Sequence, residues 1–262
     1  MKVFILAAGQ GTRLRPLTND IPKCLVKMNG TSLLDIQLEV LKNSGIAEED
    51  IYIVGGYKID VLKKHLSGSR INIIDNHNYK ETNMVCSLMC AKNELQQADD
   101  VIVAYGDIIY QDEVLKRILA SNEEISVVVD DSWLDYWKQR GENPLDDAET
   151  LIFDDDGYLL EIGQKTDKLE KVQSQYIGLM HFKGDGVHKL VSLCLEAKAR
   201  SSSGKTLWRT SRTYKEMYMT DLLQGLIDTG NKLKTVHINR GWFEVDCISD
   251  LRLAESVAED KN

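Results

Sequence analysis

The sequence has little proline, no C-x-x-C cysteine pair and no long apolar segment. Only three of its 262 residues are proline, too few for a collagen-like or proline-rich disordered chain. Its five cysteines form no zinc-knuckle or redox motif, and we expect reduced thiols in the cytoplasm. The apolar runs, such as residues 3–8, are too short to span a bilayer, and we expect no secretion signal.

An excess of positive charge is also missing. The chain carries 32 basic and 41 acidic residues, a formal net charge of −9. This balance argues against nucleic acid and against an anionic membrane as partners, because both require a basic protein surface. Any phosphate group must therefore be bound locally, by a few cations, backbone N–H groups or a metal ion.

The arrangement of apolar residues predicts an α/β fold. Over the first 130 residues, short buried strands alternate with amphipathic helices. The strands are expected at 2–8, 50–56, 71–75, 101–105 and 125–130, and the helices at 32–44, 59–66, 84–95 and 113–119. This alternation predicts a Rossmann-like, mostly parallel sheet with helices on both faces.

The second part of the chain follows a mixed pattern. A D-D-D-G turn at 154–157 lies between two apolar runs and predicts an antiparallel hairpin. Further helices are expected at 187–199 and 220–229, the second with Thr220 as its N-cap. No repeat or linker interrupts the chain, so we expect one domain over residues 1–262, with two halves that meet near residue 130.

The strongest motif follows the first expected strand. Residues 6–18 read L-A-A-G-Q-G-T-R-L-R-P-L-T, and a Pro-Lys pair follows at 22–23. Two glycines directly after a buried strand let a ligand approach the backbone, where N–H groups can bind phosphate. The motif is not the dinucleotide fingerprint of dehydrogenases, because Leu14 stands where that fingerprint has its third glycine.

Two aspartates end apolar strands much further along the chain. Asp107 follows the strand at 101–105, and Asp246 follows the short apolar run at 242–245. Ligands of open α/β sheets bind at the carboxyl ends of the strands. Two carboxylates that meet there beside a triphosphate would form a Mg²⁺ site. Spacing alone does not bring them together, and a turn or helix cap is the alternative role for Asp107.

The glycine-rich motif and the Pro-Lys pair resemble the signature of the nucleotidyltransferases that make sugar nucleotides and CDP-alcohols. The resemblance implies that Arg13 and Lys23 are catalytic cations, which hold the triphosphate and the reacting phosphate. Asp107 and Asp246 match the family's metal-binding pair, which implies Mg²⁺ as the cofactor. The half up to about residue 130 then binds the nucleotide, and residues 131–262 bind the acceptor and end in the C-terminal helix.

The resemblance also implies the residues around the nucleotide and a third catalytic cation. The nucleotide-binding residues would be Leu6, Ala8, Gly9, Gly11, Thr12, Gly56, Asn83, Ser87 and Asp107. Lys165, which precedes a Y-I-G strand, matches a lysine that reaches the acceptor phosphate, with Lys168 and Lys171 as nearby rivals. Considered alone, Lys165 would be a solvated surface residue.

Residues 82–88, T-N-M-V-C-S-L, resemble the phosphocholine and phosphonate cytidylyltransferase branch, so CTP is the expected nucleotide. Asn83 and Ser87 would supply polar groups to cytosine. The expected acceptor-binding residues are Trp133, Trp137, Arg140, Glu149 and Tyr176. The aromatic residues would either surround a quaternary ammonium or pack in the core. Acidic residues would instead pair with a primary ammonium, and the candidates are Asp130, Asp131, Asp135 and Glu149.

The sequence therefore predicts a Mg²⁺-dependent cytidylyltransferase that joins CTP to a small phosphorylated alcohol or phosphonate and releases pyrophosphate. Phosphocholine and aminoalkyl phosphates or phosphonates are the expected acceptors. One alternative is a sugar-1-phosphate nucleotidyltransferase that uses UTP, dTTP or CTP. A non-catalytic nucleotide-binding regulator is an alternative of another class, although the presence of all four residues of the catalytic and metal-binding set argues against it. A homodimer is left open.

Overall fold

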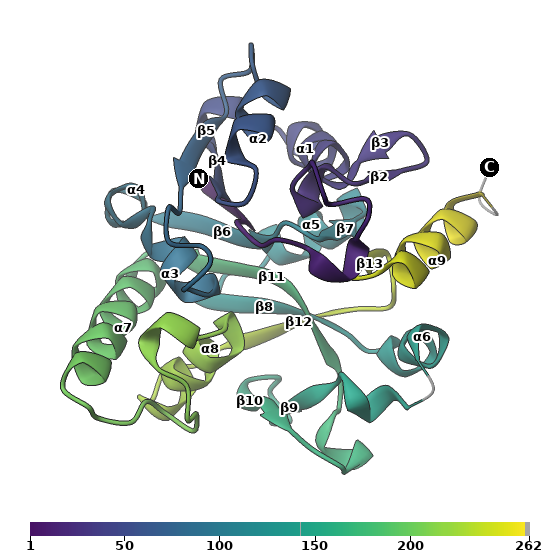
Figure 1. Ribbon diagram of the computed structural model, residues 1–262. Coiled ribbons are helices and arrows are strands. Elements are labelled where there is room, and N and C mark those ends of the chain that lie inside the picture. The colour runs from purple at the N-terminus through teal and green to yellow at the C-terminus, as the bar shows by residue number, and fades with distance from the viewer. Residues whose placement is uncertain (142, 260–262) are drawn as a thin grey trace.

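A seven-stranded sheet forms the centre of the computed structural model, which describes residues 1–141 and 143–259 (Figure 1). The strand order is β12-β8-β11-β6-β1-β4-β5. These strands are β1 (Lys2–Ala7), β4 (Ile51–Gly55), β5 (Asn72–Asp75), β6 (Asp100–Tyr105), β8 (Ile125–Asp130), β11 (Gln175–Lys183) and β12 (Lys234–Ile238). Only β11 runs antiparallel to its neighbours in this sheet, so the predicted α/β fold with a mostly parallel sheet is confirmed.

Helices cover both faces of the sheet because its strands are apolar on both sides. In β1, Phe4 and Leu6 pack against one layer of helices, whereas Val3 and Ile5 pack against the other. The first layer consists of α3 (Met84–Met89), α4 (Lys92–Gln96), α7 (Asp185–Ser202) and α8 (Met219–Asp228). The second layer consists of α1 (Leu33–Asn43), α2 (Ile59–His65) and α5 (Asp112–Leu119).

The remaining elements lie around this core. The expected hairpin is present as β9 (Glu149–Phe153) and β10 (Leu159–Lys165), beside α8 at the bottom of Figure 1. Two further antiparallel pairs join β7 (Ile108–Tyr110) to β13 (Trp242–Glu244) and β2 (Lys27–Met28) to β3 (Thr31–Ser32). The last helices are α6 (Trp133–Arg140) and α9 (Ile248–Glu259). Short 3-10 helices occur at Thr12–Leu14, Lys23–Leu25, Glu48–Asp50, Pro144–Asp146, Leu169–Lys171 and Tyr214–Glu216. Among the described residues, no helix is both long and apolar enough to cross a membrane.

Three local expectations were wrong. The helix expected over 84–95 is broken at Ala91, whose φ of −93° and ψ of 22° leave the helical region and let both shorter helices bury leucines in one cluster. Helix α7 continues to Ser202, three residues beyond its expected end. Helix α8 begins before Thr220, because the Asp221 carboxylate accepts a hydrogen bond from the Tyr218 N–H at 2.9 Å and caps the helix there.

Asp130 links the end of β8 to the segment that leads into β13. Its side chain is fully buried, and Oδ2 accepts hydrogen bonds from Trp242 Nε1 and Arg240 Nη1, both at 2.8 Å. Its Oδ1 accepts from the backbone N–H groups of Ser132 at 3.0 Å and of Arg240 at 2.9 Å. With four donors already on this carboxylate, Asp130 is not available to a substrate ammonium, which corrects that alternative from the sequence.

We expect Asp130→Ala to lower the free energy of unfolding by about 3 kcal/mol, because it leaves a buried indole N–H and an arginine without their partner. The matched control is Asp131→Ala, since Asp131 forms only a half-exposed pair with His237 and its loss should cost at most about 1 kcal/mol. Urea denaturation of both variants measures the difference. Equal losses of unfolding free energy in the two variants would show that Asp130 contributes no more to stability than the exposed Asp131.

Candidate active site

The candidate site lies where β1 and β6 end side by side. The backbone N–H of Gly106, the first residue after β6, donates to the carbonyl of Leu6 near the end of β1 at 2.9 Å. A Cβ atom at Gly106 would lie 2.8 Å from that carbonyl oxygen, so only glycine permits this approach. The glycine-rich loop follows β1 and Asp107 follows Gly106, which brings the two sequence motifs to one edge of the sheet.

Lys23 connects the two carboxylates expected to bind metal. Its Nζ lies 2.6 Å from Asp107 Oδ2 and also forms an ion pair with Asp246 Oδ1. Burial lowers the pKa of Lys23, but the two carboxylates outweigh burial and raise it above its ordinary value, so the ammonium stays charged. Gly11, at a φ of +60°, lets the loop pack directly on Lys23, since a Cβ there would lie 2.9 Å from the lysine Cβ.

Asp246 also forms ion pairs with two arginines, Arg13 and Arg140. Arg13 Nη2 lies 2.8 Å from Asp246 Oδ2, while the arginine side chain itself is 64% exposed. Burial raises the pKa of Asp246, yet Lys23, Arg13 and Arg140 together lower it below its ordinary value. The Oδ1 atom of Asp107 is buried and has no hydrogen-bond partner within residues 1–141 and 143–259. The site therefore holds paired charges and one free carboxylate oxygen.

Two cavities meet at these carboxylates. The larger, of about 320 Å³, is lined by Arg13, Asp107, Trp137, Glu149, Lys165, Tyr176 and Asp246, among others. The smaller, of about 130 Å³, is lined by Leu6, Ala8, Gly9, Lys23, Asn83, Ser87 and Asp107, among others. Asp107 and Met84 line both cavities. Most residues expected around the nucleotide thus line the smaller cavity and most of those expected around the acceptor line the larger one, which also contains Asp246, while Asp107 is shared by both.

The smaller cavity contains six of the nine residues expected around the nucleotide, but Gly11, Thr12 and Gly56 do not line it. Beyond Gly9 there is open space, which lets a ligand reach the backbone. Asn83 Oδ1 accepts the Met84 N–H at 2.9 Å and caps α3. Ser87 Oγ accepts a hydrogen bond from the Asn76 amide at 3.0 Å. Both side chains expected to contact cytosine therefore already have protein partners.

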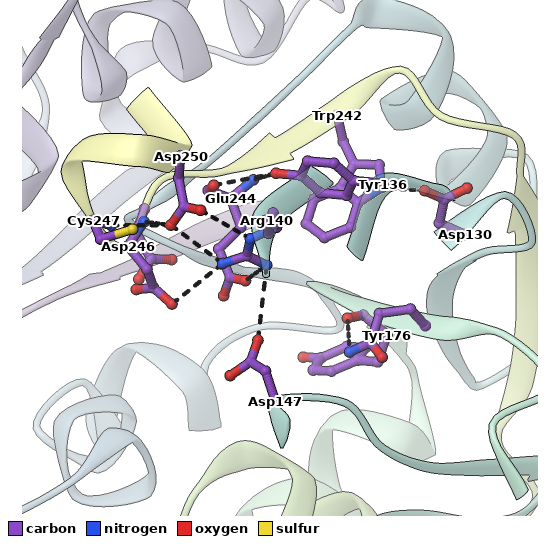
Figure 2. A network of polar contacts seen from close by, with 12 residues as sticks. Asp130, Tyr136, Arg140, Asp147, Tyr176, Trp242, Glu244, Asp246, Cys247 and Asp250 are labelled. Carbon is purple, nitrogen blue, oxygen red and sulfur yellow. Dashed lines mark hydrogen bonds and ion pairs between the residues drawn. The ribbon is translucent and has the colours of Figure 1, made fainter. Parts of the chain in front are cut away.

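Arg140 lies behind the site rather than on either cavity, in the middle of a group of carboxylates (Figure 2). Its side chain is 9% exposed, and its guanidinium lies 2.7 Å from Glu244 and 3.1 Å from Asp250. Asp250 in turn accepts the backbone N–H of Asp246 at 3.0 Å. Burial and the neighbouring Asp246 raise the pKa of Glu244 to about 8. Arg140 therefore positions the segment that carries Asp246.

The aromatic residues divide between core and cavity. Trp133, Tyr136 and Trp242 are buried and pack edge to face around Trp137 and one another, so core packing accounts for these three. Trp137 also lines the larger cavity, and its buried indole Nε1 has no hydrogen-bond partner in the described chain. Among the residues of this cavity that the sequence did not indicate are four with polar side chains, Tyr105, Gln175, Arg212 and Tyr218. Arg212 lies in a loop without any motif, so no local signal could have found it.

Comparison with known proteins identifies the family. A family model described as a MobA-like NTP transferase domain matches residues 3–150. The chain belongs to the MobA-like NTP transferase family. This NTP transferase is 37% identical over 258 residues to the CTP:phosphoglutamine cytidylyltransferase of Campylobacter jejuni, which covers 97% of this chain and 98% of the relative. It is 27% identical over 269 residues to the choline-phosphate cytidylyltransferase of Streptococcus pneumoniae, with 100% of both chains covered.

Solved structures share the fold of this NTP transferase. The CTP:phosphocholine cytidylyltransferase from Streptococcus pneumoniae superposes with a TM-score of 0.71 at 23% identity and covers 98% of each chain. The inositol-1-phosphate CTP transferase from T. maritima superposes with a TM-score of 0.74 at 19% identity and covers 100% of this chain and 96% of its own. The resemblance to nucleotidyltransferases of the cytidylyltransferase branch is confirmed by these relatives.

We expect Arg140→Met to lower the free energy of unfolding of this NTP transferase by about 3–5 kcal/mol at neutral pH, because it leaves buried carboxylates without their cation. The loss should be smaller at about pH 6, where Glu244 is protonated with or without Arg140, than at about pH 9, where the wild-type Glu244 is ionised and pairs with Arg140. Denaturant titrations across pH measure both effects. The control is Lys138→Met on the same helix, whose exposed pair with Asp135 should contribute little. A loss independent of pH would contradict the electrostatic origin.

Proposed function

We propose that this NTP transferase transfers the cytidylyl group of CTP to the phosphate of a small acceptor and releases pyrophosphate. The observation that carries the proposal is the Lys23 ammonium, which lines the smaller cavity and pairs both with Asp107, which lines both cavities, and with Asp246, which lines the larger one. CTP is the proposed nucleotide because the two relatives of nearly equal length are both named as cytidylyltransferases. The smaller cavity then holds the nucleotide and the larger one the acceptor.

The reaction requires positioning and charge neutralisation more than acid–base chemistry. An oxygen of the acceptor phosphate attacks the α-phosphorus of CTP, and the bond from that phosphorus to the pyrophosphate oxygen breaks. The attacking oxygen is already ionised at neutral pH, so no general base is needed. Arg13 and Lys23 stabilise the charge on the triphosphate, and Lys165 orients the acceptor phosphate. Lys165 is suited to this role because it lines the cavity from the end of β10, and its Nζ donates to the backbone carbonyl of Asp147 at 3.4 Å.

The same carboxylates fit a Mg²⁺ ion. Asp107 offers a buried oxygen without a partner in the described chain, and Asp246 lies across the Lys23 ammonium from it. Residues 1–141 and 143–259 contain no group of three metal-binding side chains, so the ion would take its other ligands from phosphate and water, as Mg²⁺ commonly does. Bound there, Mg²⁺ would neutralise phosphate charge.

We expect Asp107→Asn and Asp246→Asn each to lower the rate of pyrophosphate release by at least about 1000-fold, because both remove charge at the point of transfer. The assay combines Mg²⁺ and each of the four NTPs with phosphocholine, phosphoethanolamine, phosphoglutamine, glycerol phosphate or a hexose phosphate. Far-ultraviolet circular dichroism checks that both variants fold.

The matched control is Asp155→Asn, in the exposed turn of the β9–β10 hairpin, which should keep full activity. Full activity of either site variant would disprove the assigned role of that carboxylate. Release from UTP or dTTP with the hexose phosphate, and not from CTP, would replace cytidylyl transfer with sugar nucleotide synthesis on the same fold.

A further inference from the structure

The larger cavity contains a second group of polar side chains that the proposed transfer step does not use. Glu149 begins β9, Gln175 begins β11, and Arg212 lies in the segment between α7 and α8. All three line the cavity that also contains the Asp107 and Asp246 carboxylates. The charges that act on Glu149 are those of Lys165, Arg212 and Asp221, whereas Lys23 and Arg13 pair with Asp246. The cavity thus has two separate polar ends.

Arg212 is held as a preformed anion-binding group. Its Nη1 lies 2.9 Å from Asp221 Oδ1, and the Asp221 side chain is 1% exposed. The guanidinium also stacks over the Tyr218 ring at 4.6 Å from its centre. The ion pair with Asp221 and the stacking on Tyr218 therefore fix the orientation of the Arg212 guanidinium. Within the described chain, Nε and Nη2 of Arg212 make no further hydrogen bond, which leaves two parallel donors for a carboxylate.

Glu149 and Gln175 provide hydrogen-bond acceptors, in contrast to the donors of Arg212. The Glu149 carboxylate lines the cavity and forms no ion pair with any described residue. Burial raises its pKa more than Lys165 and Arg212 lower it, so a cation that bound beside it would stabilise its charged form. The Gln175 Oε1 atom is buried and has no hydrogen-bond partner within residues 1–141 and 143–259. The Glu149 carboxylate, which has a side-chain hydrogen bond with Thr220 but no ion pair, and the unpartnered Gln175 oxygen suit an ammonium group that still carries N–H donors.

We propose that this end of the cavity binds the α-carboxylate and α-ammonium of a phosphorylated amino acid, with Arg212 on the carboxylate and Glu149 and Gln175 on the ammonium. The inference rests on the proposed cytidylyl transfer, since the phosphate of the same molecule must reach Lys165 and the carboxylate pair. A choline group fits less well, because it has no N–H to offer Gln175 and no carboxylate for Arg212. An acceptor without a carboxylate would also bring its cation near the Arg212 guanidinium with no negative charge of its own between them.

The test compares acceptors that differ in one charged group. Phosphoserine and phosphoglutamine are assayed with CTP and Mg²⁺, each beside one analogue that lacks the α-carboxylate and another that lacks the α-ammonium. We expect kcat/KM of the better amino acid to exceed that of each of its analogues, and of phosphocholine, by at least about 100-fold, because each loss leaves buried polar groups of the site unpaired.

Variants then assign each charge to its residue. Arg212→Lys keeps a cation beside Asp221 but removes the fork, and Arg212→Gln removes the charge; both should abolish discrimination against the analogue without the carboxylate and leave discrimination against the other analogue. Glu149→Gln should do the reverse. The matched control is Arg209→Gln, an exposed arginine of the same loop, which should leave all the ratios unchanged.

The outcomes separate this inference from the proposed function. Equal or better turnover of phosphocholine or phosphoethanolamine with CTP would overturn the amino acid site and keep cytidylyl transfer. Variants at Arg212 that weaken all acceptors equally would overturn it as well. Calorimetric binding of a phosphorylated amino acid that Arg212→Gln abolishes, without pyrophosphate release from any NTP, would keep the site and overturn the transfer reaction. The inference would also be overturned if the phosphorylated amino acids were neither bound nor turned over.

Discussion

The ion pairs of Lys23 with Asp107 and Asp246 are the interaction on which the site depends. Asp107 lies 84 positions after Lys23 in the sequence, and Asp246 lies 223 positions after it. Two carboxylates brought this close in a half-buried place would repel each other, and one of them would become protonated. The ammonium between them removes that penalty. Backbone contacts bring the two carboxylates here, since β13 pairs with β7 and the Val245 N–H donates to the Asp107 carbonyl at 3.0 Å, and the lysine compensates their charges.

The cations around Asp246 differ in how firmly they are held. Arg140 is buried and tied to Glu244 and Asp250, whereas Arg13 is mostly exposed and reaches Asp246 from the open side of the cavity. The Arg140 side of the site is therefore held in place, whereas Arg13 can exchange its ion pair with Asp246 for one with a ligand. This division suits catalysis by positioning, in which the protein groups stay in place and only the arriving phosphates rearrange charge.

The sequence predicted those parts of the fold and site that leave a local signal. The apolar strands, the glycine-rich loop and the hairpin turn all have one, and the structure contains them. The meeting of Asp107 with Asp246 has none, and only a family resemblance indicated it. Trp133 and Trp137 have a spacing that fits both a core and a cavity, and packing against Trp242 places only Trp137 at the cavity. β7 and β13 have three residues each, so they are too short to show an alternating pattern from which their pairing could be predicted.

The charges of the site also constrain how a nucleotide can enter it. Arg13, Lys23 and Arg140 face a larger set of carboxylates, formed by Asp107, Glu244, Asp246 and Asp250. The site thus has no net positive charge of its own, in a chain that already carries −9. A triphosphate that arrives here must draw Lys23 and Arg13 away from their carboxylates or bring a cation with it. In the first case the carboxylates lose their cations to the phosphates, and in the second the added cation can pair with both, so nucleotide and cation binding are coupled through Asp107 and Asp246.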